Sequence, residues 1–159
     1  MRNLRSSDRR QLEQILISCN AFTSAEVACA LELLDSVLDN PDQQDYEVIV
    51  AEVAGQVAGY VLFGAVPLTQ GNYDLYWIAT DPELQGQGFG RRLMAETEGR
   101  LRARGARMLC LETSSQEFYQ RTRRFYEQGG YQEEARIRDF YRPGDDRITY
   151  VKRFSNLDE

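Results

Sequence analysis

The stretch DPELQGQGFGRRL, residues 81–93, decides how the rest of this sequence is interpreted, because it holds three glycines within five positions. The residues before it, YDLYWIAT (73–80), form a β-rich run, and those after it carry apolar side chains at helical spacing. Glycines at a strand-to-helix corner let a ligand approach backbone that a Cβ would otherwise cover. The free amides and the positive end of the helix dipole favour an anionic group there. We therefore predict an anion-binding loop.

Two common phosphate-binding motifs fail at specific positions of this loop. A Walker A loop needs a Gly-Lys pair, and the sequence contains none. A dinucleotide-binding GxGxxG motif that began at Gly86 would need its third glycine where Arg91 stands. The pattern that does fit is QxxGxG, formed by Gln85, Gly88 and Gly90. A diphosphate above the first amides of the helix is the ligand that this pattern favours.

Composition limits the class of protein. The chain has 159 residues, a net charge of −6 and 42% hydrophobic residues. These values are typical of one globular domain, which we expect to span residues 1–159. The acidic excess argues against general nucleic-acid binding, because that binding depends on neutralising phosphates. No apolar run approaches the ~20 residues of a membrane-spanning helix, and the N-terminus lacks an apolar leader. We therefore expect neither nucleic acid nor a membrane as a partner.

Two residue types limit the chemistry. The sequence has no histidine, which excludes histidine-based triads and most zinc sites, so we expect no metal. Acid–base work must then fall to Glu, Asp, Tyr, Lys or Cys. Cys19, Cys29 and Cys110 are an odd number of cysteines without a CxxC pair. That pattern suits a reducing compartment, and we expect a cytoplasmic protein.

The order of predicted elements indicates an α/β (α+β) fold. Helices are predicted at 7–19, 23–40, 88–104 and 118–128, and strands at 3–5, within a hairpin at 46–66, and at 73–80, 107–115, 131–141 and 147–154. A strand, helix and strand in the middle imply one parallel crossover in an otherwise antiparallel sheet. The mostly apolar run at 107–115 predicts a central strand covered on both faces.

The QxxGxG pattern resembles the acetyl-CoA pyrophosphate loop of the GNAT superfamily of N-acetyltransferases, and the resemblance extends over residues 46–154. It implies a mixed, mostly antiparallel sheet of six or seven strands with a central, splayed parallel pair, flanked by about four helices. It also implies acetyl-CoA as co-substrate. The pantetheine would lie on the backbone of Ile78, Ala79 and Thr80, as an added strand does. The pyrophosphate would lie on Gln85, Gly86, Gln87, Gly88, Phe89, Gly90 and Arg91.

Two catalytic residues follow from the same resemblance. RRFYEQGGY (123–131) is similar to the FYxxxGF segment of the family, which implies that Tyr126 is the general acid that protonates the CoA thiolate. From the residues alone, Tyr126 would instead belong to an aromatic packing stripe with Phe118 and Phe125. Glu112 ends the MLCLE run of the predicted strand, and this segment resembles the LEVR segment of bacterial ribosomal-protein alanine acetyltransferases, which implies a general base. The alternative is a strand-end glutamate that reaches solvent.

The acceptor remains open at this point. The segment SSQEFYQ (114–120) lacks an asparagine of the alanine acetyltransferase pattern, and the interval from Glu112 to Tyr126 is longer. We expect acetyl transfer to a primary amine of a small molecule, with a peptide N-terminus (alanine acetylation) or a non-catalytic CoA sensor as alternatives. Asp139 and Tyr141 lie where the family closes its acceptor site, and an acidic site would favour a cationic amine. The resemblance also allows a homodimer.

Overall fold

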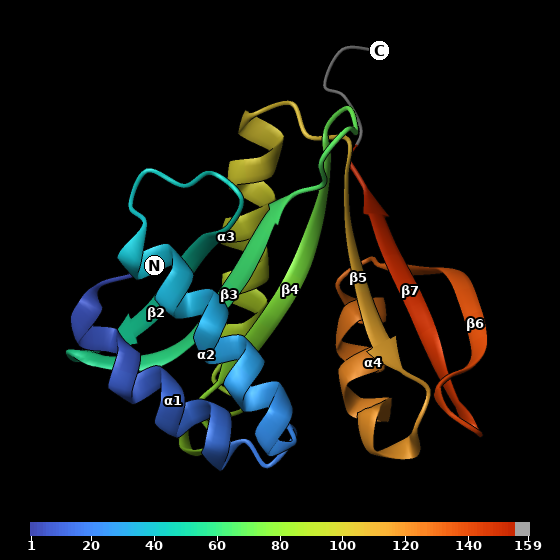
Figure 1. Cartoon of the computed structure of the whole chain (residues 1–159), viewed down its shortest axis with the longest axis horizontal. Helices are drawn as coiled ribbons and strands as arrows, with labels where there is room; N and C mark the ends of the chain where they lie inside the picture. The colour runs from blue at the N-terminus through green and yellow to red at the C-terminus, as the bar shows by residue number, and fades with distance from the viewer. Residues whose placement is uncertain (155–159) are drawn as a thin grey trace. The chain divides into compact units, whose positions relative to one another are not determined.

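The computed structural model describes residues 1–154 (Figure 1). Its internal contacts divide the chain into two units. The first unit joins Met1–Ala65 to Leu75–Leu101, and the second joins Val66–Asp74 to the chain from Arg102 onwards. The boundaries fall within one strand (Asn72–Thr80) and within the last turn of one helix (Phe89–Ala103), so each unit contains part of both.

The first unit is a sheet with helices on both faces (Figure 1). Its strands are β1 (Arg2–Asn3), β2 (Glu47–Val53), β3 (Gln56–Ala65) and most of β4 (Asn72–Thr80). The helices α1 (Arg9–Ser18) and α2 (Ser24–Asp39) cover one face, and α3 (Phe89–Ala103) lies on the other. Short 3₁₀ turns precede α1 and α3, at Ser6–Asp8 and Pro82–Leu84.

The core of this unit follows from strand periodicity. Alternate residues point to the same face of a strand, so Val48 and Val50 of β2 lie opposite Leu62 and Tyr60 of β3 on the side of α1 and α2. Apolar residues at helical spacing on α1 and α2 complete this core cluster: Leu12, Ile15, Leu16, Ala30 and Leu34. Burying each of the leucine, isoleucine and valine side chains contributes about 1.5–3 kcal/mol.

Local signals explain where these elements begin and turn. The predicted capping box of α2 is confirmed, because Thr23 Oγ1 accepts from the Glu26 amide at 3.2 Å and Glu26 Oε2 accepts from the Thr23 amide at 2.7 Å. The β2–β3 hairpin turns at Ala54 and Gly55, with φ of 49° and 78°. Positive φ at both positions is the geometry of a tight two-residue hairpin.

The second unit contains β5 (Met108–Ser114), β6 (Gln132–Arg142), β7 (Asp145–Arg153), a 3₁₀ turn (Glu117–Tyr119) and α4 (Gln120–Gln128). Strand β7 lies between β5 and β6 and is antiparallel to both. Over the described residues the strand order is β1-β2-β3-β4-β5-β7-β6, a seven-stranded mixed sheet in which β4 and β5 are the parallel pair. The predicted fold class is therefore confirmed, with four α-helices among residues 1–154.

Three predictions about elements need correction. The strand at 107–115 is not covered on both faces: Leu109, Leu111 and Thr113 are buried, whereas Glu112 is exposed between them. One face of β5 therefore packs on a core, whereas the other, with Met108, Cys110, Glu112 and Ser114, is only partly buried or exposed. The first strand is Arg2–Asn3, because residues 4 and 5 already lead into the first helix. The helix predicted from 118 begins as a 3₁₀ turn, since Tyr119 adopts φ −88° and ψ 5°.

Among the helices of residues 1–154, none combines the length and the apolar character that a membrane crossing requires.

Candidate active site

The predicted anion-binding loop lies in the first unit, between β4 and α3. Asp81 begins it by capping the 3₁₀ turn, where Asp81 Oδ1 accepts from the Glu83 amide at 2.9 Å. The backbone then turns at Gly86 and Gly88, each with φ +80°. A Cβ at either glycine would meet no atom within 4 Å. The left-handed backbone, rather than crowding, is thus what requires glycine there, and the surface above the loop is open.

Not all the predicted loop amides remain free for a ligand. The Gln85 amide donates to Pro82 O at 3.3 Å, and the Gln87 amide donates to Leu84 O at 3.4 Å. The amides of Phe89, Gly90 and Arg91 belong to the first turn of α3, where no intrahelical acceptor exists. The start of α3 is therefore the best-equipped part of the loop for an anion, since the positive end of the helix dipole also lies there.

At the end of β4, the backbone groups of Ile78 and Thr80 point to one edge of the strand, and those of Ala79, the third residue predicted to bind pantetheine, point to the other. A Cβ at Gly59 of β3 would lie 2.5 Å from Ala79 O, so the Ala79 carbonyl faces β3. Backbone groups alternate between the edges of a strand, which directs those of Ile78 and Thr80 to the opposite edge. Ala79 instead contributes a buried side chain to the core. Gly59 was missed by the sequence analysis, because a lone glycine in a β-rich run carries no specific signal.

Cys19 is a second residue that the sequence analysis did not connect with this segment. Its thiol lies 3.2 Å from Thr80 O and donates a hydrogen bond to it, so this carbonyl is already engaged. Burial raises the pKa of the Cys19 thiol, although the contact with Thr80 opposes the shift. The Thr80 amide is therefore better suited than the Thr80 carbonyl to contact a ligand.

Substitution of Gly88 tests the loop. Alanine at φ +80° carries a penalty of about 1–2 kcal/mol, so Gly88→Ala should distort the loop and weaken acetyl-CoA binding about tenfold, measured by titration calorimetry. Gly105→Ala is a matched control, because Gly105 has φ +73° and open space at the other end of α3. Equal dissociation constants for the two variants would contradict a cofactor role for the loop.

Tyr126 lies on α4 in the second unit, and its side chain is 6% exposed. Its ring contacts those of Phe125, Tyr131 and Tyr150, with centroids 5.4, 5.9 and 6.4 Å away. Phe118 does not join this packing as predicted, since it is 67% exposed. Burial raises the pKa of the Tyr126 phenol, because desolvation disfavours the phenolate. Tyr126 is therefore fully protonated at neutral pH, the form that a proton donor needs.

Glu112 projects from the open face of β5 and is half exposed. Its Oε1 lies 3.4 Å from Arg147 Nε of β7, yet this buried Nε makes no well-oriented hydrogen bond. The two side chains therefore attract each other by charge but are not joined by a hydrogen bond. A carboxylate in this state keeps its lone pairs available for a further N–H donor.

Asp74, at the start of β4, is an acidic neighbour that the sequence analysis missed. Burial raises the pKa of its carboxyl, and the charge of Glu112 raises it further. A carboxylate whose pKa is raised is a better base near neutral pH than an ordinary one. Its sequence signal was weak, because an aspartate within a β-rich run is more simply interpreted as a surface residue.

Comparison with known proteins identifies the family. Residues 44–133 match the family model of the acetyltransferase (GNAT) domain. A crystal structure assigned to the GNAT family of acetyltransferases, from Desulfovibrio desulfuricans, is 39% identical, covers 96% of each chain and superposes with a TM-score of 0.92. The chain belongs to the GNAT acetyltransferase family. No curated protein matched this GNAT chain in sequence.

More distant GNAT structures share the fold. The ribosomal-protein-S18-alanine N-acetyltransferase of Escherichia coli is 22% identical, with 99% of this chain and 96% of that chain covered and a TM-score of 0.73. An aminoglycoside 6′-N-acetyltransferase complexed with coenzyme A is 15% identical, with 96% and 95% covered and a TM-score of 0.72. At these identities the likeness concerns the fold alone.

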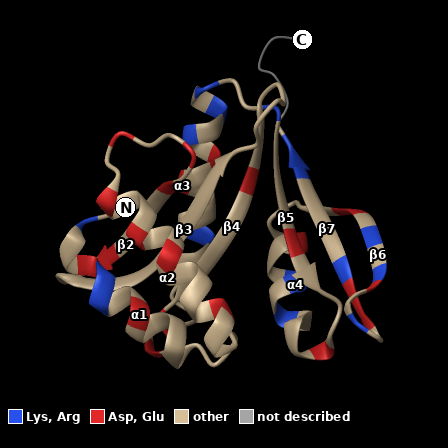
Figure 2. Cartoon of the chain, viewed as in Figure 1, with Lys and Arg blue, Asp and Glu red and all other residues tan. Residues whose placement is uncertain are grey.

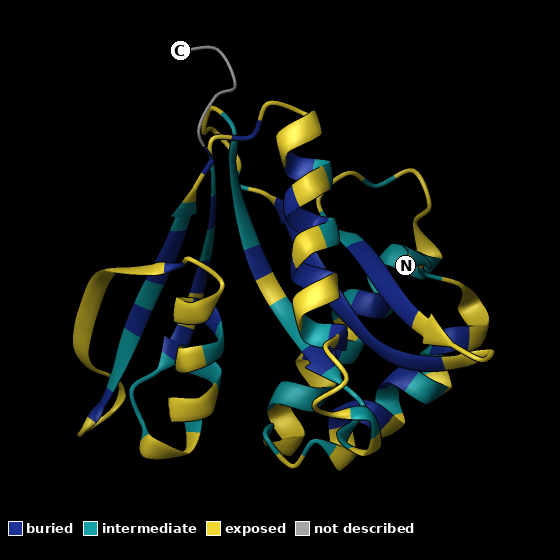
Figure 3. Ribbon diagram, turned by 180° about the vertical axis from the view of Figure 1, so that it is seen from behind, coloured by how far each residue is buried: buried dark blue, intermediate teal, exposed yellow. Residues whose placement is uncertain are grey.

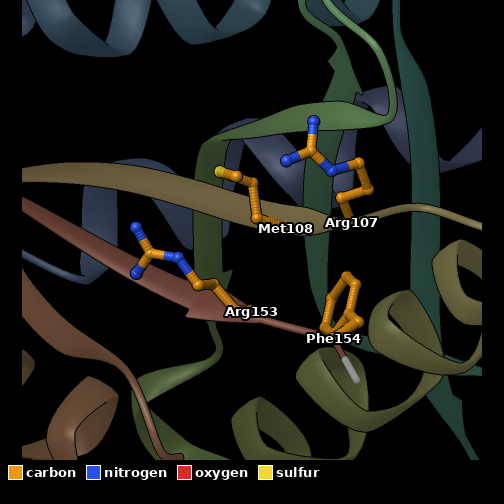
Figure 4. Close-up of a pocket in the computed structure, with 4 residues that line it drawn as sticks. All are labelled: Arg107, Met108, Arg153 and Phe154. Carbon is orange, nitrogen blue, oxygen red and sulfur yellow. The ribbon is translucent and has the colours of Figure 1, made fainter. Parts of the chain in front are cut away.

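A pocket of about 200 Å³ in this GNAT chain is lined by none of the predicted site residues (Figure 4). Its lining comes from the beginning of β5 and the end of β7: Arg107, Met108, Arg153 and Phe154. Ligands of parallel strands bind at the carboxyl ends, and this is the amino end of β5. Backbone hydrogen bonds from Arg107 to Gly71 O and from Phe154 to Arg107 O close the region at 2.7 and 2.8 Å. We therefore assign the pocket no catalytic role.

Other groups in the GNAT chain do not suggest metal or thiol chemistry. In the part of the chain that the structure describes, no group of three or more Cys, Asp or Glu residues is arranged to hold a metal ion. All three cysteines are free thiols. Burial raises the pKa of the Cys110 thiol, which disfavours the nucleophilic thiolate.

Proposed function

We propose that this GNAT protein transfers acetyl from acetyl-CoA directly to a primary amine of a small molecule. The observation that carries the proposal is the pair of complementary groups in the second unit: the half-exposed carboxylate of Glu112 and the buried, protonated phenol of Tyr126. The open amides at the start of α3 would hold the diphosphate of the co-substrate. Backbone groups of Ile78 and Thr80 would contact the pantetheine, whereas Ala79 would serve as packing.

The proposed reaction needs two proton transfers. Glu112 accepts a proton from the bound ammonium, directly or through a water, and the free amine attacks the thioester carbonyl. The tetrahedral intermediate collapses by breaking the C–S bond, and the departing thiolate takes the Tyr126 proton. Burial makes the phenol a weaker acid, whereas desolvation would make the thiolate a stronger base, so the two effects would oppose each other in this transfer. No covalent enzyme intermediate forms.

Two other functions remain as alternatives. Several structural neighbours act on different amines, among them aminoglycosides and the alanine terminus of ribosomal protein S18. A peptide N-terminus is therefore the second acceptor class to test. A CoA-binding sensor without turnover is the third, and the presence of both Glu112 and Tyr126 argues against it.

Thermal unfolding with acetyl-CoA, CoA, ATP and NADH separates cofactor classes. A ligand at 100 times its Kd stabilises the folded state by about 2.7 kcal/mol, so we expect a shift of several degrees with both CoA species alone. A panel of amino acids, polyamines, aminoglycosides and peptides then identifies the acceptor by CoA release. A shift with ATP or NADH instead would refute the assignment of the loop. Binding of CoA without any turnover would favour the sensor.

A further inference from the structure

Three side chains from three neighbouring strands lie in a row in the second unit. The carboxylate of Glu112 (β5) lies 3.4 Å from the Arg147 Nε (β7), and the Arg147 guanidinium lies 4.3 Å from the centre of the Phe140 ring (β6). In the β5–β7 ladder Glu112 is opposite Thr149 and Arg147 is opposite Ser114. Glu112 and Arg147 are thus diagonal neighbours, a separation that long side chains bridge.

An irregularity of β6 brings Phe140 to this row. Strand β6 is exposed along its whole length (Figure 3) and its pairing with β7 shifts between Ile137, opposite Arg147, and Arg142, opposite Asp145. The extra residues include Asp139, whose φ of +53° is unusual for a residue other than glycine. Bulges and strained backbone of this kind recur beside functional sites, where they redirect a side chain.

Hydrogen bonds fix the bulge to the end of β5. The Asp139 amide donates to Asp146 Oδ1 at 3.0 Å, and Asp139 Oδ1 accepts from the Gly144 amide at 2.7 Å. Across the strands, the Asp146 amide donates to Ser115 Oγ at 2.8 Å, and Ser114 Oγ donates to the buried carboxylate of Asp145. Phe140 is therefore held in place relative to the strand that carries Glu112.

Arg147 itself has unused donors. Its side chain is 26% exposed, and in the described part of the chain its terminal Nη1 and Nη2 groups donate no hydrogen bond. Two arginines of these strands, where basic and acidic residues mix in Figure 2, are engaged: Arg136 of β6 binds Glu133 and Arg153 of β7 binds Glu134 through two hydrogen bonds each. A guanidinium that is stacked on a ring and open at its terminal fork is suited to a planar carboxylate.

We propose that Arg147 determines the specificity of the acceptor site by binding a carboxylate of the acceptor, so that the substrate is an amino acid or a similarly small amino-carboxylate. This inference rests on the proposed function, because Glu112 must receive the ammonium. Glu112 and Arg147 are adjacent, so the amine and the carboxylate of the acceptor must also be close together. An α-amino acid, in which both groups are attached to one carbon, meets that requirement.

The charge of Arg147 also disfavours other acceptors. A polyamine or an aminoglycoside has no carboxylate to bind the guanidinium, so its positive groups would be attracted by Glu112 alone and repelled by Arg147. For an amino acid, the same positive charge favours the neutral amine over the ammonium, which assists its deprotonation by Glu112. Specificity and reactivity would then arise from the same contact.

Binding to the CoA complex tests this inference without requiring turnover. Amino acids and their α-amides are titrated calorimetrically into the protein saturated with CoA, and the same pairs are compared in kcat/KM with acetyl-CoA. A charge-assisted bidentate contact predicts that at least one acid binds about 10–100-fold more tightly than its amide. Arg147→Gln should abolish that preference, and Arg147→Lys should retain only part of it, because lysine lacks the fork.

Arg153→Gln is the matched control, since it removes the same charge from the far end of β7 and should leave the acid-to-amide ratio unchanged. The unfolding temperature of each variant is measured as well, and an unchanged value shows that a lost preference for acids over amides does not result from a loss of folding. Equal binding of acids and amides by the wild-type protein, or an equal loss for both in Arg147→Gln, would overturn the inference. If acids bind selectively through Arg147 but no acceptor is acetylated, the inference holds and the proposed function fails.

Discussion

Tyr126→Phe should lower kcat by about 10²–10³-fold while leaving the dissociation constant of acetyl-CoA unchanged. The substitution removes only the hydroxyl that would protonate the thiolate, and the phenylalanine ring keeps the contacts with Phe125, Tyr131 and Tyr150. Steady-state rates and calorimetric titration of CoA measure the two quantities. The rate of CoA thiol release, measured at a saturating concentration of one amine acceptor, reports the loss directly.

Tyr150→Phe provides the control for this variant. The Tyr150 hydroxyl donates to Glu127 Oε1 at 2.8 Å, and burial, together with this contact, raises the pKa of Tyr150 to about 12. Its removal should cost about 1 kcal/mol of folding free energy, with no effect on kcat. A normal kcat in Tyr126→Phe would remove Tyr126 from the mechanism and leave it as a packing residue.

Glu112→Gln should lower kcat/KM at neutral pH by about 10²-fold, because glutamine cannot accept the proton of the acceptor ammonium. The activity of the wild-type protein should fall at acidic pH, where a protonated carboxyl can no longer accept the ammonium proton. In the variant, that acidic limb of the pH–rate profile should disappear, so that the remaining activity depends less on pH. Glutamine also preserves the size of the side chain, and an unchanged unfolding temperature would show that β5 is intact.

Asp74→Asn distinguishes the two carboxylates. Burial and the charge of Glu112 raise the pKa of Asp74, so loss of that charge in Glu112→Gln must lower the pKa of Asp74. If Asp74 were the base, Glu112→Gln would retain most of its activity and its acidic limb would move to lower pH. We expect instead that Asp74→Asn keeps the greater part of the activity. The opposite result would transfer the role of base from Glu112 to Asp74.

Much of the fold followed from local patterns. The capping box at Thr23, the paired turn residues of the β2–β3 hairpin and the periodicity of α1 and α3 all act within a few residues of sequence. The strand–helix–strand order around the glycine loop was enough to predict a parallel pair within an antiparallel sheet. The exposed face of β5 was not predictable in this way, because an apolar run does not show which of its residues will lack a covering layer.

The sequence by itself therefore determined the family, the glycine loop and the two catalytic candidates, since each depends on residue types at short, fixed spacing. Only the tertiary structure decided the surroundings of those residues. Asp74, Arg147 and Phe140 come from three different strands, and no local pattern connects them with Glu112. The association of Arg147 and Phe140 with Glu112 depends on the β5–β7 register and on the β6 bulge, and that of Asp74 on the position of β4 next to β5 in the strand order. Both features arise from pairing between strands that are distant in the sequence.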